Sequence, residues 1–289
     1  IVTDMIRFFT SQKMLGPKIQ DGTLRKNLVE PPWHCPDEYL NLPIHMRQFE
    51  MELLTPKAAD NGEVVLQLHG GGYIAKIRNA YRDFAVRYSK IDQYRVLSVD
   101  YRVAPQHPYP AAFQDALEAY RWLLYSGFSG DRIILAGDSA GGGLVLALAM
   151  YLRDQSMPLP KKLVMMSPWT DLTASGPSYQ ENYENDPLFG NTRESMIYNG
   201  EYAGKQDPKL PYISPLFGDF HGLPPMLFQV GSLEMLLSDS VLAAQKAKEA
   251  GCDVTLTVYQ DMFHVFQLSM DKLAESRAAW DEVAAFLGK

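Results

Sequence analysis

The stretch ILAGDSAGGG, residues 134–143, runs an apolar segment directly into a serine that is flanked by glycines. Ser139 stands in a G-x-S-x-G pattern, with Gly137 and Gly141 on either side. At a sharp turn from strand to helix the backbone is crowded around such a serine, so only small residues fit two positions away. The apolar run before the pattern and the run GGGLVLALAMYLRDQ after it predict this strand and helix. The turn is therefore expected to expose the hydroxyl of Ser139 as a nucleophile.

The rest of the chain alternates short apolar runs with helical patterns. Runs of this kind, β-branched or leucine-rich with little alternation, are typical of strands buried on both faces. We predict strands at 64–69, 95–100, 132–137, 162–167, 225–230 and 254–259. Helices are predicted at 80–91, 111–126, 139–155, 238–250 and 272–287. This order indicates a mostly parallel sheet with helices on both faces, and the alternating stretch 45–56 is expected to open it as an antiparallel edge.

Composition and charge exclude several classes of protein. The 289 residues are 46% hydrophobic and 21% charged, with a formal net charge of −7. Nucleic-acid binding needs a basic face, and the scattered Lys and Arg residues form none in this sequence. The apolar run 144–152 is too short to cross a bilayer, which takes about 20 residues. We expect no nucleic-acid partner and no stable membrane insertion.

The two cysteines, Cys35 and Cys252, lie far apart and in no metal-binding spacing. Reduced thiols in a reducing compartment are favoured over a single long-range disulfide, so a cytoplasmic location is expected. The sequence has no signal-peptide pattern, and it starts at Ile1, which leaves open a preceding segment.

Two segments do not follow the strand and helix repeat. Residues 1–40 contain a proline-rich passage, and residues 171–220 are rich in Asn, Pro, Gly and Tyr, with a helix-like piece near 192–203. Neither segment is able to bury a core alone. We therefore expect one domain over 1–289, with both segments forming a cap over one of its faces.

The sequence HGGGY, residues 69–73, ends an earlier predicted strand. Attack on an ester carbonyl develops a negative oxygen, which backbone N–H groups aimed at it in advance stabilise. Glycines let the main chain pass close enough to donate those hydrogen bonds. Gly71 and Gly72 are the predicted donors, with the N–H of Ala140 at the start of the helix as a third. Phosphate binding is the weaker interpretation, because no P-loop Lys-Ser/Thr follows.

A nucleophilic serine needs a base, and His264 is the candidate. Of six histidines, only His264 follows the last predicted strand, in a loop within YQDMFHVFQ. In the order of triad residues that accompanies a G-x-S-x-G serine, histidine comes last. This position favours catalysis over an ordinary surface role for His264.

The acid of the triad should lie between the strand at 225–230 and His264, where two carboxylates compete. Glu234 falls in the loop just after the strand, where catalytic groups collect in open α/β sheets. Asp239 stands at the start of the next helix, where a carboxylate is favourable for structural reasons alone. We favour Glu234, whose role would be to orient the imidazole and to stabilise the imidazolium.

Together these stretches resemble the hormone-sensitive-lipase-like branch of the α/β-hydrolases. The matching segments are HGGGY (69–73), VDYRVAPQHPYPAAFQDALEAYRWL (99–123), GDSAGG (137–142), SPWTDLT (167–173), GLPPMLFQVGSLEMLLSDS (222–240) and DMFHVFQ (261–267). The resemblance implies an α/β-hydrolase fold and a carboxylesterase with Ser139 as nucleophile, His264 as base and an oxyanion hole at Gly71, Gly72 and Ala140. It also supports Glu234, although Asp is commoner than Glu at that position. For residues 100–102 it implies a scaffolding role.

These observations predict hydrolysis of acyl esters through an acyl-enzyme, without metal or organic cofactor. The resemblance implies that the acyl groups are of short to medium chain length. A deacetylase or amidase using the same triad stays open, as does a non-catalytic small-molecule-binding protein on this fold. The presence of His264 favours the enzyme. Activity is expected to fall as the pH drops through the range near 6.5 in which histidine takes up a proton. The strand at 254–259 is expected either to pair with its twin in a homodimer or to be covered by the last helix.

Overall fold

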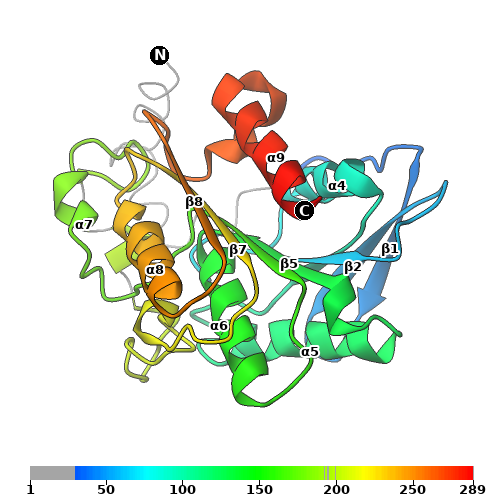
Figure 1. The fold of residues 1–289 in the computed structure, drawn as a ribbon, viewed down its shortest axis with the longest axis horizontal. Coiled ribbons are helices and arrows are strands. Elements are labelled where there is room, and N and C mark those ends of the chain that lie inside the picture. The colour runs from blue at the N-terminus through cyan, green and yellow to red at the C-terminus, as the bar shows by residue number, and fades with distance from the viewer. Residues whose placement is uncertain (1–29, 192, 194, 199, 289) are drawn as a thin grey trace.

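The computed structural model describes residues 30–191, 193, 195–198 and 200–288. Its strands form one central sheet (Figure 1). This sheet has eight strands in the order β1-β2-β4-β3-β5-β6-β7-β8. β1 pairs with β2 and β2 pairs with β4 in antiparallel orientation. All other neighbouring strands in the sheet are parallel. The strands are β1 Tyr39–His45, β2 Glu50–Pro56, β3 Val64–Leu68, β4 Arg95–Asp100, β5 Ile133–Asp138, β6 Lys162–Met166, β7 Met226–Gly231 and β8 Val254–Tyr259.

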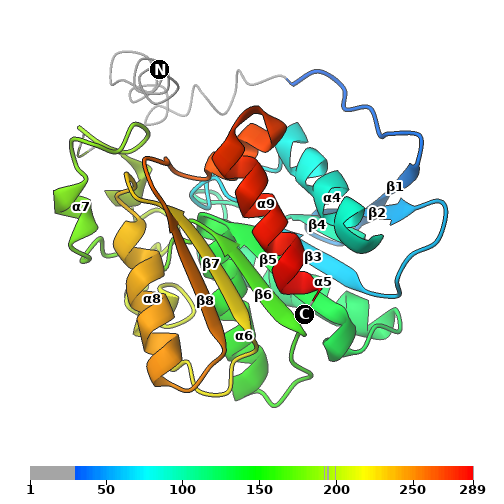
Figure 2. The same cartoon turned by 45° about the horizontal axis from the view of Figure 1, so that its top comes forward.

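Helices cover both faces of the sheet. They are α4 Asn79–Asp92, α5 Ala111–Tyr125, α6 Ala140–Asp154, α7 Ser178–Glu181, α8 Leu237–Glu249 and α9 Ala274–Leu287. Short 3-10 helices occupy Gly130–Arg132, Met196–Tyr198, Pro215–Phe217 and Phe266–Lys272. Figure 2 shows α4 and α9 over the near face of the sheet and α5 and α6 behind it. Within the described ranges, no helix combines the length and the apolar character that crossing a membrane requires.

The buried strands explain the continuous apolar runs. In β3 all five residues are buried, because side chains of a strand point alternately to the two faces and both faces are covered. Val64, Leu66 and Leu68 pack into the core beneath α5 and α6, and Val65 packs into the core beneath α4 and α9. The predicted α/β-hydrolase architecture is confirmed, with all six predicted strands and all five predicted helices within two residues of their expected bounds.

The stretch 45–56 departs from its prediction. It was expected to form one antiparallel edge strand, and instead it contains the turn between β1 and β2, closed by a hydrogen bond from the N–H of Met46 to the carbonyl of Phe49. β2 does enter the sheet antiparallel, but the edge is β1. Pro43 lies in β1, and an edge strand tolerates proline because one side of it needs no N–H donor.

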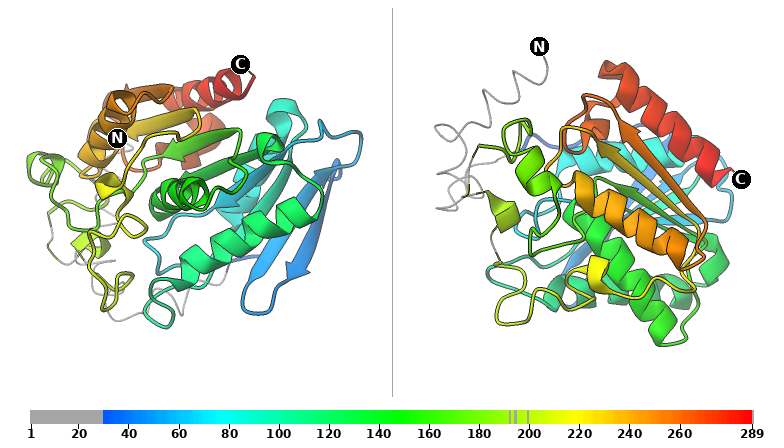
Figure 3. Two further views of the ribbon diagram at one scale, coloured as in Figure 1. Left: turned by 60° about the horizontal axis from the view of Figure 1, so that its bottom comes forward. Right: turned by 60° about the vertical axis from the view of Figure 1, so that its left-hand side comes forward.

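The two segments predicted as a cap are only partly described. Residues 1–29 lie outside the described residues, and Tyr39 and Leu40 belong to β1 rather than to a cap. The helix expected near 192–203 is reduced, in the described part of that stretch, to the 3-10 helix Met196–Tyr198. Figure 3 shows the lime and yellow segment 171–220 gathered beside α8, which α7 contacts. Cys35 and Cys252 are free thiols, as predicted.

Candidate active site

Ser139 occupies the turn between β5 and α6 that its glycines predict. Its φ of 52° and ψ of −123° lie in a region that residues with a side chain rarely adopt. A Cβ on Gly137 would lie 2.5 Å from the carbonyl oxygen of Gly141, and one on Gly141 would lie 2.0 Å from that of Leu68. The two glycines are therefore required by sterics, and they allow the strained turn to place the Ser139 side chain beyond the end of β5.

The structure brings Glu234 and His264 together. Glu234 follows β7 and is completely buried, and His264 follows β8 with a relative exposure of 7%. Nδ1 of His264 and Oε2 of Glu234 are 2.7 Å apart. Because an ionised carboxylate only accepts hydrogen bonds, Nδ1 carries the proton and Nε2 is left with a free lone pair. An imidazole in this tautomer is able to accept a proton.

Asp239, the other candidate acid, points elsewhere. Its Oδ2 accepts hydrogen bonds from the backbone N–H groups of Thr170 at 2.7 Å and Asp171 at 2.8 Å. Burial raises the pKa of the Asp239 carboxyl well above its ordinary value. Asp239 thus fixes the loop after β6 to the start of α8, and of the two carboxylates it is Glu234 that contacts His264.

The loop after β3 brings the predicted donors of the oxyanion hole toward the turn at Ser139. Gly71 has a φ of 106° and Gly72 a φ of 61°, both in the region that favours glycine. A Cβ on Gly71 would lie 2.7 Å from that of Ala75. For the described residues the structure gives no acceptor for the N–H of Gly71 or Gly72. Ala140 begins α6, so its N–H has no carbonyl partner within the helix.

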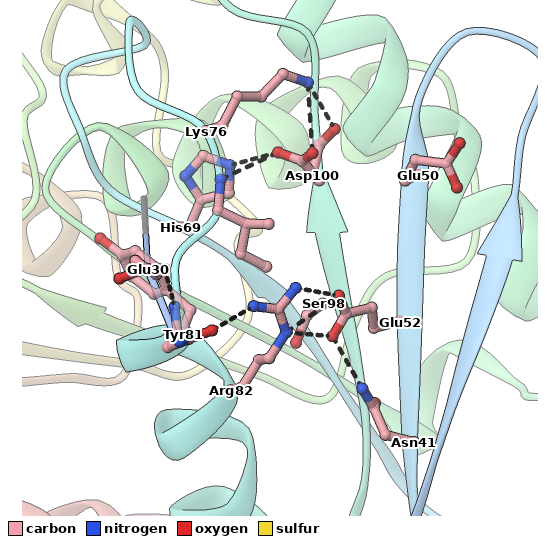
Figure 4. Close-up of polar contacts among 12 residues, drawn as sticks. Glu30, Asn41, Glu50, Glu52, His69, Lys76, Tyr81, Arg82, Ser98 and Asp100 are labelled. Carbon is pink, nitrogen blue, oxygen red and sulfur yellow. Dashed lines mark hydrogen bonds and ion pairs between the residues drawn. The ribbon is translucent and has the colours of Figure 1, made fainter. Parts of the chain in front are cut away.

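Polar contacts with residues at the end of β4 hold the loop that follows β3 (Figure 4). Oδ1 of Asp100 accepts the N–H of Ile77 at 3.0 Å, and Nζ of Lys76 lies 3.5 Å from the other carboxylate oxygen. The hydroxyl of Tyr101 donates to the carbonyl of His69 at 2.5 Å. Burial lowers the pKa of His69 to about 4, so its ring, which stacks on Tyr101, is neutral at pH 7. These contacts agree with the scaffolding role expected of Asp100 and Tyr101.

Arg102 also makes structural contacts. Its guanidinium donates to both carboxylate oxygens of Asp115, at 2.7 and 3.0 Å, and its backbone N–H donates to the same carboxylate at 2.8 Å. Asp115 lies in α5 and is buried. The pair therefore fastens the end of β4 to α5 and is not directed at Ser139 or His264.

Comparison with known proteins agrees with this geometry. Residues 65–268 match the model of the alpha/beta hydrolase fold family. The chain belongs to the α/β-hydrolase family. A curated acetyl-hydrolase of Streptomyces hygroscopicus is 39% identical to it over 80% of this chain and 77% of the relative, and an esterase of Acinetobacter venetianus is 35% identical over 78% and 74%. A crystal structure of an esterase of the bacterial hormone-sensitive lipase family superposes with a TM-score of 0.86 at 36% identity, covering 99% of this chain and 95% of that one. The predicted family, fold and enzyme class are confirmed.

In this α/β-hydrolase, residues of 171–220 that the sequence did not single out contact the candidate site. The side-chain amide of Asn182 donates to the carbonyls of Ser232 and Glu234, at 3.0 and 2.8 Å. Asp186 accepts the N–H groups of Phe189 at 2.9 Å and Met235 at 2.7 Å. The ring of Phe189 lies 4.8 Å from that of His264. This segment therefore forms a wall beside Glu234 and His264, the candidate acid and base. The only signal for these contacts in the sequence is the group of polar residues within ENYENDPLF (181–189).

Proposed function

We propose that this α/β-hydrolase is a carboxylesterase that cleaves short- to medium-chain acyl esters through an acyl-enzyme. Ser139 is the nucleophile, His264 the general base and Glu234 the acid that orients it. The observation that carries this proposal is the buried 2.7 Å pair of His264 and Glu234 at the same end of the sheet as the strained turn at Ser139. Such a pair supplies the base that a serine hydroxyl needs in order to react.

In the first step Nε2 of His264 takes the proton of the Ser139 hydroxyl as Oγ bonds to the ester carbonyl carbon. The carbonyl electron pair moves to oxygen, and the imidazolium formed is stabilised by the Glu234 carboxylate 2.7 Å from Nδ1. Collapse of the tetrahedral species breaks the bond to the alcohol oxygen, which leaves with the proton from Nε2. The acyl group is then an ester of Ser139.

The developing oxyanion is bound by the N–H groups of Gly71, Gly72 and Ala140. Their lack of acceptors among the described residues supports this role, since donors already engaged elsewhere would be of no use to the reaction. In the second step His264 takes a proton from water, and the hydroxide attacks the acyl carbon. The carboxylic acid leaves, and the Ser139 hydroxyl regains its proton.

The preference for short to medium acyl groups rests on the wall beside the site. Sδ of Met196 lies 2.6 Å from where a Cβ on Gly72 would be, so this side chain packs directly onto the predicted oxyanion loop. The acetyl-hydrolase among the relatives supports a small acyl group as well. Deacetylation or amide hydrolysis by the same triad is the alternative that an ester series and an amide series together would separate.

Three further proposals accompany this function. The chain acts as one domain in which residues 171–220 cap the site. It resides in the cytoplasm, in keeping with the free thiols of Cys35 and Cys252. It forms a homodimer through β8, which lies at one edge of the sheet with every residue partly exposed.

Initial rates on p-nitrophenyl esters of about two to sixteen acyl carbons test the function. We expect the wild type to be fastest on the short esters and Ser139→Ala to be inactive on all of them. A wild type no faster than Ser139→Ala on every ester would overturn the carboxylesterase and favour a binding protein. Equal activity on the matching anilides would favour the amidase.

A further inference from the structure

Ser167 is the first residue after β6, fully buried, and its hydroxyl lies between the loops that carry Glu234 and His264. We propose that Ser167 is a positioning residue that fixes the acid and the base of this site relative to each other. The inference rests on the proposed triad, and it adds a residue that neither the motifs nor the resemblance assigned to the reaction.

The first contact is with the acid. Oγ of Ser167 donates to Oε1 of Glu234 at 2.7 Å, and the N–H of Gly231 donates to the same oxygen at 2.5 Å. Oε2 is the oxygen that faces Nδ1 of His264. Ser167 and Gly231 therefore hold one carboxylate oxygen, which leaves the other in a single orientation toward the imidazole. Hydrogen bonds to an ionised acceptor are about twice as strong as those between neutral groups, so this arrangement resists rotation of the carboxylate.

The second contact is with the loop that carries the base. The N–H of Val265 donates to Oγ of Ser167 at 3.2 Å. Val265 has a φ of 50° and a ψ of 46°, a left-handed conformation that is a genuine outlier for a β-branched residue. Such a conformation persists only where the surroundings hold it. The Ser167 hydroxyl is one of these restraints, and it acts on the residue next to His264.

The third connection runs through the backbone to the nucleophile. The N–H of Ser139 donates to the carbonyl of Met166 at 2.9 Å, and the N–H of Trp169 donates to the carbonyl of Ser139 at 2.8 Å. In the chain, Ser167 lies between Met166 and Trp169, and its own φ is 47°. One short segment after β6 thus contacts Ser139 through its backbone. Through one hydroxyl it also contacts Glu234 and Val265, the residue next to His264.

The chemical consequence concerns the proton on the imidazole. The hydroxyl hydrogen of Ser167 withdraws negative charge from the carboxylate that faces Nδ1. Without this hydrogen the carboxylate attracts the imidazolium more strongly, so His264 becomes free to act as base only at higher pH. Asp138 and Asp186 also interact electrostatically with His264, and replacing Ser167 leaves both carboxyls unchanged. A purely structural serine would have no such effect on the pH profile.

The test compares Ser167→Ala with the wild type on p-nitrophenyl acetate between about pH 5 and 9. We expect kcat to fall by about 10- to 100-fold, as when other residues that orient a site are removed, with little change in KM. The acid limb of the kcat/KM profile should move to higher pH. Ser240→Ala is the matched control, because Ser240 is equally buried and its hydroxyl has no partner among the described residues.

Unchanged kcat and an unchanged acid limb in folded Ser167→Ala would overturn the inference. An equal fall of kcat in Ser240→Ala would do the same, since loss of any buried serine would then explain the effect. If Ser167→Ala does not fold, Ser167→Cys keeps the size of the side chain with a weaker donor and should shift the acid limb in the same direction. Residual full activity of Ser139→Ala would instead contradict the proposed triad itself.

Discussion

Gly70 and Asp138 join the predicted oxyanion loop to the turn at Ser139, the proposed nucleophile. The N–H of Gly70 donates to Oδ1 of Asp138 at 3.1 Å, and the hydroxyl of Tyr81 donates to Oδ2 at 3.1 Å. A Cβ on Gly70 would lie 2.3 Å from this carboxylate, so the contact also requires the glycine. The residue before Ser139 therefore sets the distance between two parts of the site that are 68 residues apart in the sequence.

Asp138 should make the stability of the protein depend on pH. Burial raises the pKa of Asp138 to about 6 from an ordinary value of 3.8. Its contribution to the free energy of unfolding is therefore fully present below about pH 4 and is lost as the pH rises through 6, a change of about 3 kcal/mol. Asp138→Asn lacks this titration. Urea unfolding at several pH values between about 4.5 and 7.5 should show the variant gaining stability relative to the wild type as the pH rises. A difference that stays constant over this range would contradict the prediction.

The pair of Glu234 and His264 gives a second prediction. Glu234→Gln replaces the acceptor facing Nδ1 by an amide that no longer favours the reactive tautomer, so kcat should fall by about 10³- to 10⁴-fold with KM little changed. Asp239→Asn is the control, since Asp239 contacts the backbone of residues 170 and 171 and not His264. Its kcat should remain near that of the wild type. Steady-state kinetics of both variants decide between the two acids, and a larger loss in Asp239→Asn would reverse the assignment.

Much of the fold was predictable because its causes are local. β3 and β5 are continuous apolar runs because both faces of the sheet are covered, and the period of a helix follows each of them. The strained turn at Ser139 and the positive φ of Gly72 were likewise predictable, because such backbone conformations require glycines or other small residues at fixed spacing.

The remaining features depend on contacts between distant parts of the chain. Ser167 is one serine in the stretch SPWTDLT until β6 and β7 bring it 2.7 Å from Glu234. Asp186 gains its role only when 171–220 folds back onto Met235. β1 was not recognised because Pro43 and the exposed Leu40 and Leu42 mask its alternation, and it exists through pairing with β2. Such contacts between distant residues cannot be predicted from the composition or from the hydrophobic periodicity of the sequence.

The predicted oxyanion loop provides a third test. Gly72→Ala forces a side chain onto a φ of 61° and toward Met196, at a strain cost of about 1–2 kcal/mol, and it displaces an N–H donor. Loss of one such donor typically lowers kcat by about 10²- to 10³-fold. Gly127→Ala is the matched control, because Gly127 has a φ of 96° with no atom within 4 Å of its added Cβ. Both variants should lose stability in thermal unfolding, but only Gly72→Ala should lose kcat. Equal activity of the two variants would remove Gly72 from the oxyanion hole.

Met196 gives the last prediction, which concerns the acyl group. Its Sδ packs against Gly72, so Met196→Ala removes the part of the wall that lies directly on the oxyanion loop. Each methylene accommodated in an apolar pocket is worth about 1–3 kcal/mol of transition-state binding. The ratio of kcat/KM for the octanoate to that for the acetate p-nitrophenyl ester should therefore rise by about tenfold or more in Met196→Ala. Met157→Ala removes the same side chain just after the far end of α6 and should leave this ratio unchanged. An unchanged ratio in Met196→Ala would mean that other residues limit the length of the acyl chain. An equal rise of the ratio in Met157→Ala would mean that general loosening of the fold, and not the space beside Gly72, determines the acyl preference.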